Sequence, residues 1–501
     1  MTGDTAEARA GAGRLLSGLI WNALGRGLPL LLALVLTPVL VAQMGLERWG
    51  LFTLALALVG VFGILDLGIG PALTRALSER MAEGRGEEAG QLVGTALLAL
   101  GGLAMLGAVL VFLAVPALVG RVLNVPPALE AEAVTAFRIL ALAAPLVTAN
   151  AALWGVLAAH QRFRAANLAT IPVSAMYYLG PVLVLMVWQS LVGVMLVLVA
   201  CRLLNTLSYA WLARPLLPPL GLGSPRLVAP LLRVGGWMTV SSVLNQALIY
   251  ADRFLVGAVL TLAAVAHYAT PLDLVLRMWI LPVAVAQVLL PPMASAFRSH
   301  PEVTAGLLRR GALLVVTLVL PPCLLLAGLG DWLLGLWLGA DFAREGGTVA
   351  RILGAGVFFS CLAFVPNALL DAIGRPDAAA KLIAAELVLF LPVLWVLLQG
   401  FGIEGAAVAW ALRATADALG KSVLAARLYP AARPALRRMV LPIMAAVLAL
   451  ALTAAAPTLP LAAAAAALGL LGTLLLLAPL LTVEERGALR RPAEARRLLR
   501  A

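Results

Sequence analysis

Residues 190–213 read SLVGVMLVLVACRLLNTLSYAWLA. This stretch of 24 residues contains a single charged side chain, Arg202, near its middle. A helix rises about 1.5 Å per residue, so the stretch forms a helix of about 36 Å, enough to cross a hydrocarbon core of roughly 30 Å. The sequence therefore predicts a membrane-spanning helix here.

Runs of the same kind follow one another along the 501 residues. Hydrophobic residues make up 63% of the chain and charged residues 12%, a composition too apolar for a water-soluble protein of this length. The runs lack the alternation of polar and apolar residues that a membrane β-barrel needs. The predicted spans are 15–43, 49–75, 90–119, 134–159, 167–189, 190–213, 234–260, 262–296, 311–338, 346–372, 378–400, 403–429, 439–457 and 459–483. The expected fold class is all-α, a polytopic membrane protein with about 14 transmembrane helices.

The basic residues between the spans fall almost entirely on one side of the membrane. With the amino terminus inside, the outer side carries only Arg48, Arg121, Arg344 and Arg351. Short cytoplasmic loops are enriched in arginine and lysine, so both termini are predicted to be cytoplasmic in the plasma (inner) membrane. The net charge of +12 thus reflects topology and not a nucleic acid partner.

Cysteine and histidine give no sign of a metal or redox site. Cys201, Cys323 and Cys361 lie inside apolar runs without a neighbouring ligand, and the three histidines are scattered. The loops are too short for a catalytic domain outside the membrane. We expect no cofactor and no enzymatic activity.

An internal repeat relates the two halves of the chain. Four matches recur in the same order, namely Arg-Ile-Leu at 138–140 and 351–353, Arg162 and Arg375, Pro-Val-Leu at 181–183 and 392–394, and Arg202 and Arg413. The first two pairs are 213 positions apart and the last two 211, so one gap of two residues reconciles them. This order indicates duplication of a six-helix unit, and because six is even both units have the same orientation.

The repeat predicts the domain organisation. The expected parts are a cytoplasmic segment 1–14, an N-lobe 15–213, a cytoplasmic linker 214–233, a C-lobe 234–429, a helix pair 430–483 outside the repeat and a basic cytoplasmic tail 484–501. The helix pair is almost pure alanine and leucine, and we expect it to face lipid.

Charged residues also lie inside the predicted spans, where each costs about 2.5–3.5 kcal/mol on insertion scales. The basic ones are Arg26, Arg202, Arg277 and Arg413, with Arg138 and Arg253 nearer the outer face; the acidic ones are Asp66, Asp252, Asp273, Glu386 and Asp417. Two pairs are four residues apart, Asp273 with Arg277 and Arg413 with Asp417, and each pair shares a helix face. Lys421 extends the second row.

Two interpretations of these charges stay open. Each pair could hold helices together, and Arg138, Arg253 and Lys421 could reach a headgroup region. Alternatively, arginines from both halves converge on a water-filled cavity, where guanidinium groups suit a phosphate-bearing cargo. The equivalent positions of Arg202 and Arg413 in the repeat favour the second interpretation.

Several short motifs carry a family resemblance. They are Gly-Leu-Glu-Arg-Trp-Gly-Leu-Phe at 45–52, Leu-Asp-Leu-Gly-Ile-Gly at 65–70, Leu-Thr-Arg at 73–75, Ala-Asp-Arg at 251–253, His-Tyr-Ala at 267–269, Leu-Pro at 290–291, Asp-Ala-Ile-Gly-Arg at 371–375 and Gly-Ile-Glu-Gly-Ala-Ala at 402–407. The order and spacing of these motifs resemble those of the polysaccharide-transporter branch of the multidrug/oligosaccharidyl-lipid/polysaccharide exporter superfamily. That branch contains O-antigen flippases.

The resemblance implies two six-helix lobes around a cationic lumen, and alternating access that moves an undecaprenyl-diphosphate-linked oligosaccharide to the periplasmic leaflet. The expected cargo residues are Arg26, Arg138, Arg202, Arg253, Arg277 and Arg413. Coupling to H+ or Na+ is also implied, with Asp66, Asp273 and Asp417 as candidate carboxylates and Asp252 and Glu386 as further ones. The expected partners are this cargo, membrane lipids and the ion, and the expected working form is a monomer.

The sequence leaves alternative functions open. A peptidoglycan-precursor flippase and a multidrug exporter belong to the same superfamily, although a drug exporter would favour an acidic lumen. A membrane-embedded glycan polymerase or ligase is disfavoured because the outer loops, around 121–133 and 331–346, are short.

Overall fold

The computed structural model describes residues 29–62, 86–217 and 243–481, together with 73–74, 77–78, 80–81 and 83–84. These residues form helices and short connections, with no strand among them. The chain divides into two compact units, Met1–Ala266 and His267–Ala501. The division of the repeat into lobes 15–213 and 234–429 stays a prediction.

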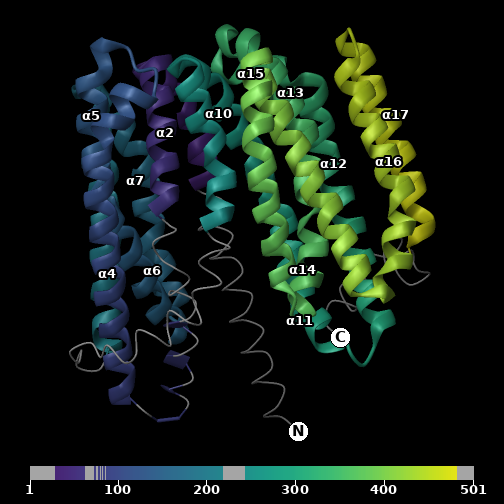
Figure 1. Ribbon diagram of the computed structural model, residues 1–501, viewed down its shortest axis with the longest axis horizontal. Helices are drawn as coiled ribbons and strands as arrows, with labels where there is room; N and C mark the ends of the chain where they lie inside the picture. Colours follow the sequence, from purple (N-terminus) through teal and green to yellow (C-terminus); the bar gives the residue numbers. More distant parts are fainter. Residues whose placement is uncertain are drawn as a thin grey trace. The chain divides into compact units, whose positions relative to one another are not determined.

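The helices of the first unit include one over residues 29–44, then α2 (Leu46–Phe62), α4 (Gly86–Ala117), α5 (Pro127–Ala141), α6 (Ala143–Ala159), α7 (Phe163–Val187), α8 (Leu191–Ala213) and a helix over 243–259. The α10 helix (Leu262–Leu276) begins in this unit and continues into the second. The second unit goes on with α11 (Ile280–Ala296), α12 (Pro301–Leu338), α13 (Ala340–Leu362), α14 (Phe364–Ala372), α15 (Pro376–Leu428), α16 (Arg433–Ala455) and α17 (Leu459–Leu477). Figure 1 shows these helices as coiled ribbons, among which α4, α12 and α15 are long.

Ten helical segments among the described residues are long and apolar enough to cross a membrane. The prediction of a polytopic all-α membrane protein is therefore confirmed, and α8 coincides with the predicted span 190–213. The α15 segment contains two predicted spans, 378–400 and 403–429, which meet at a kink at Gly402. Gly402 has a φ of 58°, a conformation that glycine adopts without strain, so the chain reverses here with no loop. The count of 14 crossings stays a prediction.

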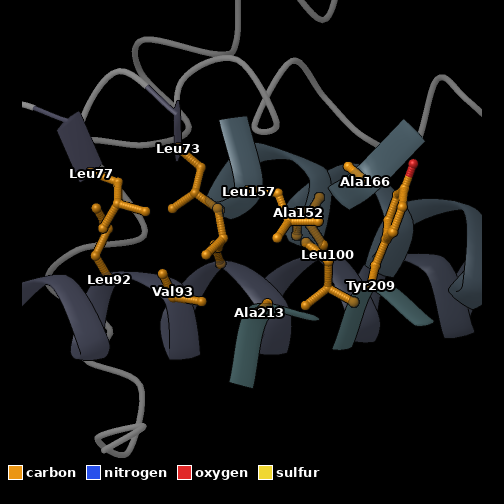
Figure 2. Close-up of a cluster of buried hydrophobic side chains, with 13 residues drawn as sticks. Leu73, Leu77, Leu92, Val93, Leu100, Ala152, Leu157, Ala166, Tyr209 and Ala213 are labelled. Atoms are coloured by element: carbon orange, nitrogen blue, oxygen red, sulfur yellow. The ribbon is translucent and has the colours of Figure 1, made fainter. Parts of the chain in front are cut away.

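A cluster of buried apolar side chains packs α4, α6 and α8 together in the first unit. Figure 2 shows Leu92 and Leu100 of α4 in this cluster with Ala152 of α6 and Tyr209 of α8. In a bilayer the lipid tails are as apolar as leucine, so such contacts stabilise helix association by close packing and not by exclusion of water. The small residues of the cluster, such as Ala152 and Ala213, allow that close packing.

An ion pair with further hydrogen bonds connects α2, α5 and α8. One carboxylate oxygen of Glu132 accepts a hydrogen bond from Arg48 Nε at 3.0 Å. The other accepts from Ser190 Oγ at 2.9 Å and from the Leu191 backbone N–H at 2.6 Å. Glu132 thereby satisfies a free N–H at the start of α8, as negative side chains do at helix amino termini.

The helix pair at the end of the chain packs against the rest of the second unit. The α16 and α17 helices run side by side (Figure 1), and both contact α12. Arg351 of α13 donates to the Ala327 carbonyl of α12 at 3.1 Å and also to the Ala454 carbonyl at the end of α16. Arg309 of α12 donates to the Leu480 carbonyl just after α17. Two arginines therefore bind the last carbonyl groups of the two helices.

Candidate functional site

The predicted site residues fall into separate groups in the two units, and each unit is described by itself. Arg26 and Asp66 lie outside the described residues. The first unit contains Arg138, Arg202, Asp252 and Arg253, and the second contains Asp273, Arg277, Glu386, Arg413 and Asp417.

Arg202 of α8 lies against an aromatic ring of α7. Its guanidinium carbon is 5.5 Å from the centroid of the Tyr177 ring, and its Nη2 donates to the Tyr177 hydroxyl at 3.2 Å. Its Nε is buried and has no hydrogen-bond partner among the described residues. The α7 and α8 helices pack together along their lengths, which fixes this pair. Arg202 therefore keeps an unused donor inside the predicted membrane span.

A row of polar side chains continues from Arg202 along the same face of α8. Thr170 Oγ1 and the Tyr209 hydroxyl share a hydrogen bond of 2.5 Å. Thr170 also contacts Asn205 Oδ1 at 3.4 Å, and Asn205 Nδ2 contacts Asn150 Oδ1 at 3.5 Å. These residues are uncharged, so the charges inside the predicted spans did not identify them. Asparagines inside apolar spans were the signal that could have identified them.

Arg138 and Arg253 have different surroundings. The guanidinium carbon of Arg138 lies 4.7 Å from the centroid of the Phe112 ring, and the side chain is half-buried. Arg253 is only 3% exposed and lies 5.5 Å from the ring of Tyr250, while the adjacent Asp252 is fully buried. Burial to this degree closes Arg253 to a cargo in this conformation, so packing within the unit is the role that its position supports.

In the second unit, the two halves of α15 bring three predicted residues together. The guanidinium carbon of Arg413 lies 5.7 Å from the ring centroids of both Phe390 and Trp410. Phe390 and Trp410 are buried, and Arg413 itself is half-buried with an Nε that has no hydrogen-bond partner in the described part of the chain. Gly356 of α13 packs so closely against Ala411 that a Cβ at Gly356 would lie 2.7 Å from the Ala411 Cβ. This contact holds the Arg413 helix against α13.

Two carboxylates accompany Arg413. Asp417 forms an ion pair with Lys421 one turn away, with 2.8 Å between Oδ1 and Nζ and side chains 14% and 12% exposed. Glu386, on the preceding half of α15, is 6% exposed, and neither of its carboxylate oxygens has a hydrogen-bond partner among the described residues. Glu386 lies close enough to interact electrostatically with Asp417, Arg413 and Lys421. The sequence predicted the row Arg413, Asp417 and Lys421 but could not place Glu386 beside it.

Arg277 occupies a break between helices. It starts a short 3-10 segment, Arg277–Trp279, that joins α10 to α11, and its side chain is exposed. Asp273 lies one turn earlier and is half-buried. The position of Arg277 suits contact with a cargo better than that of Arg253, because its guanidinium is accessible.

The Asp371–Arg375 motif covers the end of α14 and the connection to α15. The Arg375 Nε donates to Asp377 Oδ1 at 3.0 Å, and this hydrogen bond raises the pKa of the Arg375 guanidinium above its ordinary value. Lys381 also pairs with Asp377, at 3.5 Å. These charges form an exposed cluster at a helix start, outside the Arg413 group.

Arg202 and Arg413 share one feature in the two units. Each comes from the sixth helix of a predicted repeat unit and lies over an aromatic ring from the fifth. Tyr177 and Phe390 are 213 positions apart, which is the offset of the first half of the repeat. Each unit thus presents a planar cation beside an aromatic ring, an arrangement suited to a phosphate group. Among the residues that the structure describes, no group of three or more His, Cys, Asp or Glu could hold a metal ion.

Comparison with known proteins identifies the family. The family model for "Polysaccharide biosynthesis protein" matches residues 15–297. A Shigella flexneri protein named "Putative O-antigen transporter" is 27% identical over 403 residues, covering 80% of this chain and 95% of that protein. In fold, the chain is similar to a multidrug resistance MATE family transporter of the MOP superfamily in an inward-facing conformation (TM-score 0.72, 14% identity, 83% of this chain and 99% of that one). It is also similar to the lipid II flippase MurJ (TM-score 0.68, 12% identity, 91% of this chain and 98% of that one). The resemblance found in the sequence is confirmed, and the chain belongs to the polysaccharide biosynthesis protein family.

Proposed function

We propose that this protein is a flippase that moves a polyprenyl-diphosphate-linked oligosaccharide, of the kind used to build O-antigen or another surface polysaccharide, across the plasma membrane by alternating access. The protein supplies a path for the polar head and no chemistry of its own. It works as a monomer with both termini in the cytoplasm. The name of the Shigella flexneri relative and the family match support this cargo class.

The observation that carries the proposal is the equivalence of Arg202 and Arg413. Both guanidinium groups lie inside apolar helices, both lie over an aromatic ring, and both keep an Nε without a hydrogen-bond partner in the described residues. A cation inside a membrane span that keeps a buried, unused donor is costly unless a ligand uses that donor. A diphosphate meets that requirement with bidentate acceptors, whereas a cationic drug would be repelled.

The polar row beside Arg202 fits the rest of the cargo. Sugar hydroxyls both donate and accept hydrogen bonds, as do the amides of Asn150 and Asn205 and the hydroxyl of Tyr209. The polyprenyl tail needs no such groups, because it can remain in lipid while the head passes through the protein.

Coupling to an ion gradient rests on Glu386 and Asp417. Asp417 is already paired with Lys421, whereas Glu386 is buried without a hydrogen-bond partner among the described residues. Glu386, buried beside Asp417, Arg413 and Lys421, is therefore the first coupling candidate. Asp66 and Asp273 remain candidates in the same proposal.

The test is export of surface glycan in a strain that lacks its own transporter. Arg202→Ala and Arg413→Ala should each reduce export about 10- to 100-fold, because a hydrogen bond to a charged group contributes about 1.5–3 kcal/mol. Arg298→Ala, which removes an exposed arginine of the second unit, is the matched control and should export normally. Full export by the double variant Arg202→Ala/Arg413→Ala at equal protein levels would reject the assignment.

The same strain set separates the alternatives. Rescue of cells depleted of their peptidoglycan-precursor flippase, without rescue of surface glycan, would assign the cargo to that precursor. Resistance to cationic drugs that is unaffected by either arginine variant would assign a multidrug exporter.

A further inference from the structure

A groove runs along the outside of the α7–α8 pair in the first unit. It consists of two cavities of about 600 Å3 and 490 Å3, and Ala165, Trp211 and Leu212 line both. Volumes of this size are typical of sites for small ligands. The groove lies within one unit, so its shape does not depend on the placement of the other.

The larger cavity has apolar walls that are open to the surroundings of the helices. Leu204 and Leu207 of α8 are each 56% exposed, and Trp211 is 73% exposed. Leu168 of α7 forms the opposite wall. In a membrane-spanning segment, exposed side chains of this kind face lipid, and the groove is thus accessible from the bilayer.

The groove lies on the opposite side of α8 from the proposed cargo residues. A helix turns about 100° per residue, which places Arg202, Asn205 and Tyr209 on one face and Leu204, Leu207 and Trp211 on roughly the other. The same division holds on α7, where Thr170 and Tyr177 face the polar row while Ala165 and Leu168 line the groove. A ligand in the groove would therefore not contact Arg202.

The smaller cavity ends at two arginines. Arg162 precedes α7 and Arg214 follows α8, both side chains are exposed, and both line this cavity beside Leu157 and Leu216. The groove therefore combines an apolar length within the predicted span with a double positive charge at the predicted cytoplasmic membrane surface. That is the charge and polarity pattern of a lipid with an anionic headgroup.

We propose that the α7–α8 groove binds an anionic phospholipid of the cytoplasmic leaflet, with its phosphate on Arg162 and Arg214 and one acyl chain along Leu204, Leu207 and Trp211. The site is separate from the cargo path because it uses the opposite face of both helices. Tryptophan at the mouth is consistent with this position, since its ring prefers the membrane interface.

Native mass spectrometry of the full-length protein, purified in detergent, can test this proposal. Phosphatidylglycerol and phosphatidylcholine with identical acyl chains are added separately, and polyprenyl phosphate is the third ligand. We expect phosphatidylglycerol to be retained at least tenfold better than phosphatidylcholine. Arg162→Gln/Arg214→Gln should remove that preference, and Ala169→Trp, which fills the groove, should reduce retention of both phospholipids.

The matched control is Arg298→Gln/Arg437→Gln, which removes two exposed arginines of the second unit and should leave the preference unchanged. Unfolding temperatures of all variants show whether each one folds. An unchanged preference in Arg162→Gln/Arg214→Gln would overturn the proposal. So would one-for-one displacement of phosphatidylglycerol by polyprenyl phosphate, which would assign the groove to a cargo lipid.

Discussion

The guanidinium carbon of Arg413 lies 5.7 Å from the centroid of the Phe390 ring, across the bend at Gly402 that joins the two halves of α15. A cation over an aromatic face gains about 0.5–2 kcal/mol, more as the pair is withdrawn from water. The contact also limits the directions in which Arg413 can point. The ring therefore positions the arginine that we assign to the cargo diphosphate.

Replacing Phe390 should weaken cargo binding without abolishing transport. Phe390→Leu keeps an apolar side chain but removes the π face, so we expect the cargo concentration at half-maximal transport to rise about threefold to tenfold in vesicles. Phe401→Leu is the control, because Phe401 belongs to the same helix and is 68% exposed. Equal half-maximal cargo concentrations for Phe390→Leu and Phe401→Leu would show that the ring does not position Arg413.

The first unit permits a finer test, because Tyr177 offers both a ring and a hydroxyl to Arg202. Tyr177→Phe removes only the acceptor that lies 3.2 Å from Nη2, so half-maximal cargo concentration should rise about twofold to threefold. Tyr177→Leu removes the ring as well and should have the larger effect. If the half-maximal cargo concentration rose as much in Tyr177→Phe as in Tyr177→Leu, the hydroxyl and not the ring would be the important group.

The fold was accessible from sequence because it depends on one strong signal. Apolar runs of about 20 residues must become helices in a membrane, where backbone groups have no water to bind, and the span 190–213 therefore matched α8 closely. The repeat also pointed to Arg202 and Arg413, since an arginine in the same place in two duplicated units stands out in an alanine- and leucine-rich chain.

The aromatic partners of Arg202 and Arg413 could not be predicted from the sequence. Tyr177 and Phe390 lie 25 and 23 residues before their arginines, and only the packing of adjacent antiparallel helices brings them together. For the same reason, the separation of Glu386 from the row at Arg413 in sequence concealed their proximity. The sequence placed Arg253 nearer the outer face, within reach of a headgroup region, whereas its side chain is only 3% exposed.

Glu386→Gln should remove the coupling of transport to the ion gradient without lowering the stability of the fold. The substitution preserves the shape of a buried side chain and removes a charge that no hydrogen bond compensates in the described residues, so the unfolding temperature should stay equal or rise. Transport in vesicles should lose its dependence on an imposed ion gradient. If Glu386→Gln kept its gradient dependence while Asp273→Asn or Asp66→Asn lost it, coupling would be assigned to that aspartate and not to Glu386.

The Asp417–Lys421 pair should behave as a structural unit. Asp417→Asn leaves the Lys421 ammonium, only 12% exposed, without its ion-pair partner, and loss of one partner of a buried pair costs up to about 3–5 kcal/mol. The double variant Asp417→Leu/Lys421→Met should recover most of that stability, as measured by thermal unfolding in detergent.

An exposed pair provides the comparison for this effect. Arg375 and Asp377 are 47% and 30% exposed, so water and salt screen the pair and Asp377→Asn should leave the free energy of unfolding nearly unchanged. A loss of stability in Asp417→Asn no greater than that in Asp377→Asn would show that the Asp417 pair is solvated in the working protein.

The terminal helix pair offers a last prediction, on the attachment of α16 and α17. Arg351 joins α12 and the end of α16 by donating to the Ala327 and Ala454 carbonyls. Arg351→Met keeps the length of the side chain but leaves both carbonyls without this donor, so hydrogen exchange should rise over 433–480 while the rest of the second unit keeps its protection. Arg344→Met removes an exposed arginine from the same helix, α13, and should leave exchange unchanged. Because no proposed cargo residue lies in the pair, export should persist in Arg351→Met, and loss of export with intact protein levels would mean that the pair takes part in transport.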